Sequence, residues 1–218
     1  MGKRHDQDFA TYDKLFYPGN EPRVPINKLD IRTHAGLEKA EAEYAAFRTK
    51  MGIPPAAREL TYDGLKALHH HLFQDVYSWA GEQRTYTTGR THSFGPPEHI
   101  EGQMNKLFKA LARENHLRGL EPSVFAERAA KYVNDVNAYH PFIEGNGRAQ
   151  RLWLTQLAGQ AGYDIDFERI TKDQWYEASK IGFLSSDKPM AELIAANLTR
   201  LEIREIDVAA QQAPIMPA

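Results

Sequence analysis

Apolar residues recur every three or four positions along most of this 218-residue chain, and this spacing limits its fold more than any other feature. The spacing predicts helices that each bury one face. The predicted helices cover residues 33–50, 61–81, 98–116, 122–139, 148–162, 171–182 and 187–204. The stretch from Gln83 to Phe94 differs, because Thr85 to Thr88 favour extended backbone and Gly89 permits a turn. We therefore predict an all-α fold that carries one short β-hairpin.

The chain divides into three predicted regions around one hydrophobic core. Residues 1–59 form a proline-containing N-terminal arm and a helix that packs on the core. Residues 60–204 form the main domain, and residues 205–218 form a loose C-terminal tail. Hydrophobic residues make up 42% of the chain, which is enough to bury one core of this size.

The charge balance and the absence of cysteine exclude several classes of protein. The 27 Lys and Arg residues face 29 Asp and Glu residues, so no bulk attraction draws the chain to nucleic acid or to anionic lipid. No apolar run reaches the roughly 18 residues of a membrane span, and the polar N-terminus is unlike a signal peptide. We therefore expect a cytoplasmic protein without direct nucleic-acid or membrane binding. Without cysteine, catalysis must use His, carboxylate, hydroxyl or Lys groups.

Residues 140–151, with the sequence His-Pro-Phe-Ile-Glu-Gly-Asn-Gly-Arg-Ala-Gln-Arg, bring unlike chemistries together between two predicted helices. Gly145 and Gly147 allow a tight turn in which N–H groups converge where the next helix begins, an arrangement that binds anions. Arg148 and Arg151 lie three positions apart on one helical face and offer planar forks to phosphate oxygens. This part of the segment predicts a phosphate site.

The same segment supplies a metal ligand and a base. Glu144 offers a hard oxygen suited to Mg²⁺, and His140 can act as a general base near neutral pH. A nucleoside triphosphate with its metal would satisfy all these groups together. Taken singly, each feature has an ordinary alternative. Gly145 to Gly147 could form a plain turn, His140 could be a capping or core histidine, and the two arginines could be surface charges. The segment is not a Walker phosphate loop, because Gly-Lys followed by Ser or Thr does not occur at the required spacing.

These twelve residues resemble the signature of the Fic family, His-Pro-Phe-x-(Asp/Glu)-Gly-Asn-Gly-Arg-x-x-Arg, at every fixed position. The string from Leu68 to Gly81 also resembles the helix that precedes the family's flap, and Gly159 to Tyr163 resembles the end of the helix after the motif. The resemblance implies a Fic-fold helical domain that transfers AMP from ATP to a hydroxyl side chain of another protein and releases pyrophosphate.

The resemblance also assigns roles to matching positions. It implies that His140 deprotonates the target hydroxyl and that Glu144 holds the Mg²⁺ that bridges the α- and β-phosphates. The amide of Asn146 and the neighbouring N–H groups would cradle the α-phosphate, and the two arginines would hold the β- and γ-phosphates. The nucleotide-binding residues implied in this way are Gly145, Asn146, Gly147, Arg148 and Arg151. For the adenine, Trp175 and Tyr176 are candidates, although such residues are more often core aromatics.

The predicted hairpin occupies the position of the family's flap, which aligns a target segment by backbone pairing. The alternative is an ordinary surface hairpin. The target-positioning residues that the resemblance implies are Thr87, Thr88, Gly89, Arg90, Thr91 and His92.

Many Fic proteins carry an inhibitory helix with the pattern Ser/Thr-x-x-x-Glu-Gly/Asn. Ser78 with Glu82 and Ser123 with Glu127 fit its first five positions, but the residue that follows is wrong in both. The resemblance therefore favours the toxin-like class, in which a separate small antitoxin inserts its Glu against Arg151. The known targets of short Fic toxins are the ATPase subunits of DNA gyrase and topoisomerase IV, so we expect a bacterial toxin of this kind.

Four alternatives stay open. The enzyme could transfer UMP or another phosphate-containing group, or it could remove AMP from a modified protein. It could be a secreted effector that acts on host small GTPases, or a nucleotide-gated binding module without catalysis. A metal site at His69, His70 and His71 is disfavoured, because successive helical residues point about 100° apart and cannot converge on one ion.

Overall fold

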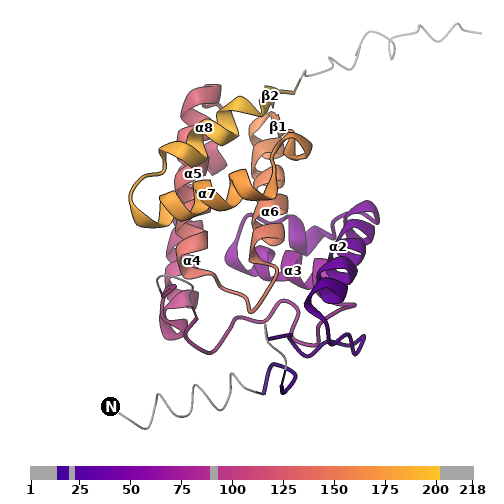
Figure 1. Cartoon of the computed structure of the whole chain (residues 1–218). Helices are drawn as coiled ribbons and strands as arrows, with labels where there is room; N and C mark the ends of the chain where they lie inside the picture. Colours follow the sequence, from indigo (N-terminus) through magenta and orange to yellow (C-terminus); the bar gives the residue numbers. More distant parts are fainter. Residues whose placement is uncertain (1–13, 20–22, 89–92, 202–218) are drawn as a thin grey trace, which may run out of the picture.

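The computed structural model describes residues 14–19, 23–88 and 93–201, and Figure 1 shows a bundle of helices with one small sheet at its edge. The α-helices are α2 (His34–Lys50), α3 (Tyr62–Phe73), α4 (Pro97–Arg113), α5 (Pro122–Tyr139), α6 (Asn146–Ala161), α7 (Lys172–Leu184) and α8 (Lys188–Ala196). The strands are β1 (Tyr163–Ile165) and β2 (Leu198–Arg200), and short 3-10 turns cover Pro55–Arg58, Asn115–Leu117 and Phe167–Arg169. The all-α prediction is confirmed.

Local sequence signals explain where the helices begin. The Thr61 hydroxyl accepts a hydrogen bond of 2.9 Å from the Gly64 N–H and caps α3, as the sequence predicts. Thr171 and Gln174 form a reciprocal capping box at the start of α7. Pro97 and Pro122 are the first residues of α4 and α5, where a missing N–H costs nothing.

The core lies between α5 and α6 and the helices around them. Helix α5 packs against α7 and α8, while α3 packs against α2 and α6. Most side chains that the periodicity predicts to be inward are buried, among them Leu65, Leu68, Ile100, Met104, Leu111, Phe125, Val133, Val136, Met190 and Ile194. Phe47 is an exception, because the apolar spacing of residues 33–50 predicts it to be inward but it is 54% exposed on α2. The two helices that flank residues 140–145 are thus held firmly from several sides.

Two helices end eight residues before the predicted position. Helix α3 stops at Phe73, and the chain then turns through residues 74–82, although Val76 and Trp79 are still buried. The helix predicted to reach residue 204 stops at Ala196, because Asn197 turns the chain and Leu198–Arg200 pair antiparallel with β1. Apolar spacing alone did not separate this short strand from one more helical turn.

The predicted hairpin does not form regular strands in the parts of residues 83–96 that the structure describes. Its two sides are nevertheless joined, because the Phe94 N–H donates a hydrogen bond of 2.9 Å to the Thr88 carbonyl. Thr87 is exposed and Thr88 is half-buried. The predicted target-positioning residues Gly89–His92 lie outside the described residues.

Within the described ranges, every helix is too short or too polar to cross a lipid bilayer.

Candidate active site

The motif covers the loop between α5 and α6 and the first turns of α6, and the loop lies at the lower ends of these two helices in Figure 1. His140 ends α5 in a left-handed conformation, with φ of +46°, and its N–H donates to the Val136 carbonyl at 3.1 Å. Gly145, with φ of +81°, immediately precedes α6. The N–H groups of Arg148 and Ala149 both donate to the Gly145 carbonyl at 3.1 Å. The N–H groups of Asn146 and Gly147 precede these first intrahelical bonds, so this helix end attracts anions.

Asn146 fixes the shape of the loop. Its side-chain oxygen accepts a hydrogen bond of 3.0 Å from the Phe142 N–H, and its side-chain nitrogen donates to the Phe142 carbonyl at 2.9 Å. The side chain is buried, with 3% of its residue exposed. In this arrangement the side-chain amide braces the loop from inside, and the backbone N–H of Asn146 belongs to the first residue of α6.

Gly145 fits the loop for two separate reasons. Its positive φ disfavours other residues, and a Cβ placed there would lie 2.5 Å from two ring carbons of Phe73 on α3. The Phe73 ring is fully buried and belongs to the packed core.

We expect Gly145→Ala to lower the free energy of unfolding by about 1–3 kcal/mol, because strain and overpacking add at this position. Gly159→Ala, in α6 with open space around its Cα, is the matched control and should be neutral or slightly stabilising. Urea denaturation of both variants checks this expectation. Equal stability of the two variants would contradict it.

Arg148 and Arg151 lie in the first two turns of α6 and differ in their partners. One terminal nitrogen of Arg148 is paired with the carboxylate of Glu41 on α2, and its guanidinium carbon lies 4.8 Å from the centre of the Phe73 ring. Arg151 has no carboxylate partner among the described residues. Its Nη1 lies near Gly147, 3.9 Å from where a Cβ would be, and its guanidinium carbon lies 5.8 Å from the Trp175 ring.

Burial and the neighbouring positive charge of Arg148 lower the pKa of Arg151 from its usual range. A half-buried guanidinium without a counter-charge is costly, and an anion at the start of α6 would offset that cost. Of the two aromatic residues suggested for the adenine, Trp175 is buried and Tyr176 is 43% exposed.

His140 and Glu144 lie at the two ends of the loop. The His140 ring stacks on Phe94, with ring centres 4.1 Å apart and planes 6° from parallel, so the last residue of the predicted flap fixes its orientation. Glu144 is exposed, and one oxygen of its carboxylate accepts a hydrogen bond of 2.9 Å from the Gly145 N–H.

Glu144 suits a magnesium ion that is held partly by the protein and partly by the substrate. No group of three His, Asp or Glu side chains that could hold an ion by itself occurs in the part of the chain that the structure describes. Mg²⁺ is commonly held by one or two carboxylates together with substrate phosphates and water. The exposed Glu144 carboxylate beside a predicted phosphate site suits that mode of binding.

The sequence analysis missed the role of His69, which is fully buried beneath the motif. The Gly81 N–H donates to its Nδ1 at 2.9 Å, so Nε2 carries the proton and donates to the Glu144 carbonyl at 2.8 Å. The ring also stacks on Phe142 at 3.9 Å between centres. In contrast, His71 contacts the Arg48 carbonyl and His70 is exposed, so the three histidines point to different places.

Burial lowers the pKa of His69 to about 3, whereas an unfolded histidine titrates near 6.5. Between these values the unfolded chain binds a proton at this position and the folded chain does not, so stability falls as the pH falls. We expect this histidine alone to contribute a slope of about 1.4 kcal/mol per pH unit over that window.

The variant His69→Gln can keep both hydrogen bonds but cannot bind a proton. Urea denaturation at several pH values between 7 and 4 should therefore show a shallower loss of stability for the variant than for the wild type. Parallel pH profiles would mean that His69 does not titrate in this way.

Arg84 is the second residue that the sequence analysis missed. It is 1% exposed, and its guanidinium donates to the carbonyls of Tyr86, Gly95, Tyr139 and His140 at 2.6–2.8 Å. The backbone N–H of Arg84 donates to the Pro141 carbonyl at 2.9 Å. Burial lowers the pKa of Arg84. One side chain therefore ties both sides of the predicted flap to the end of α5 and to the start of the motif loop.

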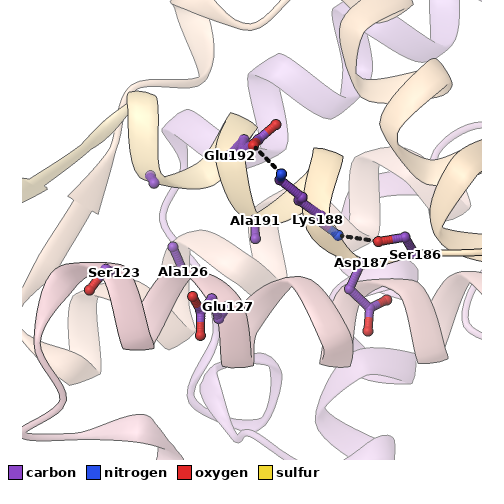
Figure 2. Close-up of a pocket in the computed structure, with 9 residues that line it drawn as sticks. Ser123, Ala126, Glu127, Ser186, Asp187, Lys188, Ala191 and Glu192 are labelled. Atoms are coloured by element: carbon purple, nitrogen blue, oxygen red, sulfur yellow. Dashed lines mark hydrogen bonds and ion pairs between the residues drawn. The ribbon is translucent and has the colours of Figure 1, made fainter.

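A groove of about 450 Å³ lies between α5 and α8, and Figure 2 shows its lining. Lys188 and Glu192 form an ion pair of 3.7 Å there, and Ser123 and Glu127 line its floor. His140 follows the opposite end of α5, about 20 Å along the helix from Glu127 at roughly 1.5 Å per residue. The groove is thus separate from the motif.

Comparison with known proteins agrees with the motif and the fold. A family model described as the Fic/DOC family matches residues 59–158. Over 184 residues the chain is 36% identical to the Probable protein adenylyltransferase y4lH of Sinorhizobium fredii, covering 84% of the chain and 94% of that relative. It is 37% identical to the Protein adenylyltransferase VbhT of Bartonella schoenbuchensis over 88% of the chain, but spans only 41% of that longer relative.

Solved structures share the same fold. The N-terminal Fic domain of a VirB-translocated Bep effector protein from Bartonella quintana, with bound ADP, has a TM-score of 0.79 at 26% identity, over 87% of this chain and 96% of that one. The BepC protein of Bartonella tribocorum, with bound AMPPNP, also has a TM-score of 0.79, at 24% identity over 87% of this chain and 98% of that one.

The helical fold, the motif loop and the named relatives together define the chain as an enzyme of the nucleotidyltransferase class, a protein adenylyltransferase. The chain belongs to the Fic/DOC family.

Proposed function

We propose that this chain transfers AMP from ATP to a hydroxyl group on another protein, and that the motif loop is the active site. The observation that carries the proposal is the arrangement at the start of α6. There a half-buried Arg151 without a carboxylate partner among the described residues lies beside Gly147, at a helix end that attracts anions. The ADP bound by the Bartonella quintana Fic domain supports a nucleotide at this site.

In the proposed reaction, His140 accepts the proton of the target hydroxyl as its oxygen attacks the α-phosphorus. The bond between the α-phosphorus and the oxygen bridging to the β-phosphate breaks, and pyrophosphate leaves. The N–H groups around Gly145, Asn146 and Gly147 stabilise the charge that develops on the α-phosphate, and Arg151 binds the outer phosphates. When bound at Glu144, Mg²⁺ would neutralise negative charge on the phosphates.

We propose further that the predicted flap aligns the target through its backbone, with Thr87 and Thr88 on its described side. The Thr88–Phe94 main-chain bond and the Arg84 contacts to both sides support a pre-shaped segment next to His140. Strand addition of this kind recognises backbone more than side chains, so it admits varied targets.

For the target, we propose the ATPase subunits of DNA gyrase and topoisomerase IV, with a separate small antitoxin as inhibitor. The supporting observation is that the inhibitory pattern Ser/Thr-x-x-x-Glu-Gly/Asn has no complete match in the 218 residues. The second candidate is modification of host small GTPases, which is favoured by the fold shared with translocated Bartonella effector proteins.

The test is to incubate the purified chain with Mg²⁺ and ATP labelled at the α-phosphate, in separate reactions with purified topoisomerase ATPase subunits and with a panel of small GTPases. Label on a topoisomerase subunit is the expected result. Label only on a GTPase would favour the effector function, and label on neither, nor on any protein of a bacterial or host lysate, would overturn AMP transfer.

A further inference from the structure

Helix α2 precedes the residues matched by the family model, yet it supplies a carboxylate to the motif. Glu41 lies near the middle of α2 and is 5% exposed. One of its oxygens accepts a hydrogen bond from the Tyr77 hydroxyl, and the other is paired with a terminal nitrogen of Arg148. Residues far apart in the sequence thus form one buried polar cluster.

Burial and aromatic contacts enclose this cluster. Burial and the charge of Glu41 raise the pKa of Tyr77 far above its usual range, so the phenol keeps its proton and stays a donor. The Tyr77 ring stacks on Trp79 with centres 4.0 Å apart, and Phe73 lies against the Arg148 guanidinium. Removal of the Glu41 carboxylate would leave the Tyr77 hydroxyl and the Arg148 guanidinium without this hydrogen-bond partner in a largely buried place, which is costly.

We propose that Glu41 is a positioning residue that holds Arg148 in place for the outer phosphates of ATP. Glu41 occupies one terminal nitrogen of the guanidinium, and the Arg148 side chain makes no other hydrogen bond to the described residues. The remaining N–H groups can bind phosphate oxygens without first losing side-chain freedom. The inference rests on the proposed function.

Charge and orientation predict opposite effects for loss of Glu41. If only charge mattered, removing the carboxylate that is paired with Arg148 would strengthen the binding of a triphosphate. If Glu41 orients Arg148, its removal weakens binding, because the released arginine must be ordered again by the nucleotide. The sign of the change in ATP affinity therefore distinguishes the charge effect from the orientation effect.

The experiment measures the Kd of Mg²⁺-ATP by calorimetry for the wild type and for Glu41→Ala, Glu41→Gln and Tyr77→Phe. We expect Glu41→Ala to weaken binding by about tenfold or more, and the two milder variants by about threefold, in the same direction. The matched control is Glu38→Ala, since Glu38 lies one turn earlier on α2 in an exposed ion pair with Lys172 at 2.5 Å. The control should stay within about twofold of the wild type.

Steady-state AMP transfer supplies the second readout. Glu41→Ala should raise the KM for ATP and leave kcat within about threefold, which a general loss of folded protein would not do. If Glu41→Ala fails to fold, the Gln and Phe variants decide the matter. Wild-type affinity, or tighter binding, in the folded Glu41 variants would overturn the inference alone, whereas a wild-type chain that binds no ATP would overturn the proposed function as well.

Discussion

His140→Ala is expected to lower the rate of AMP transfer by about 10²–10⁴-fold, the usual contribution of a general base. ATP binding should stay within about twofold of the wild type, because the anion-binding groups lie in α6 and the base lies at the other end of the loop. The rate is measured with ATP labelled at the α-phosphate, and binding is measured by calorimetry on the same preparation.

The matched control for this variant is His70→Ala. His70 is an exposed histidine on α3, and its loss should leave both rate and binding unchanged. If His140→Ala transferred AMP at the rate of the control, another group would have to accept the proton. If it lost ATP binding together with activity, His140 would belong to the nucleotide site and not to the target side.

Arg84→Met is expected to lower the free energy of unfolding by about 3–5 kcal/mol, or roughly 10 °C in Tm for a chain of this size. Replacement of a buried charge by an apolar side chain can be neutral when both partners are removed. Here the carbonyls of Tyr86, Gly95, Tyr139 and His140 stay buried and lose their common donor, so the loss dominates.

Arg58→Ala is the control, because Arg58 also donates to a backbone carbonyl, that of Ile53 at 2.7 Å, but on an exposed surface. Its effect on stability should be below about 0.5 kcal/mol. Thermal unfolding followed by circular dichroism compares the two variants. Similar Tm values for both would show that the Arg84 contacts do not hold the flap and the motif loop together.

The sequence predicted the fold class and most helices because each helix carries its own local signals. The periodic apolar residues of α4, α5 and α6 are buried, and Thr61 caps α3 as expected. The short strands β1 and β2 were missed because three residues with mixed burial carry no period of their own. Their pairing depends on a contact between segments more than thirty residues apart.

The candidate site shows the same division between local and long-range information. The residues of the motif could be named because they lie within twelve consecutive positions. Glu41, His69 and Arg84 could not, because each acts on the motif through hydrogen bonds from another part of the chain. No local signal in the sequence links any of these three residues to the motif, and the structure shows that all three are buried next to it.

The central claim is that the chain transfers the AMP part of ATP to a protein, and the most direct test follows the fate of each phosphate. Two reactions run in parallel with the same target preparation, one with ATP labelled at the α-phosphate and one with ATP labelled at the γ-phosphate. If AMP is transferred, label appears on the target only from the α-position, and the γ-label is recovered in pyrophosphate. Label on the target from the γ-position, or γ-label released as inorganic phosphate without transfer, would contradict it.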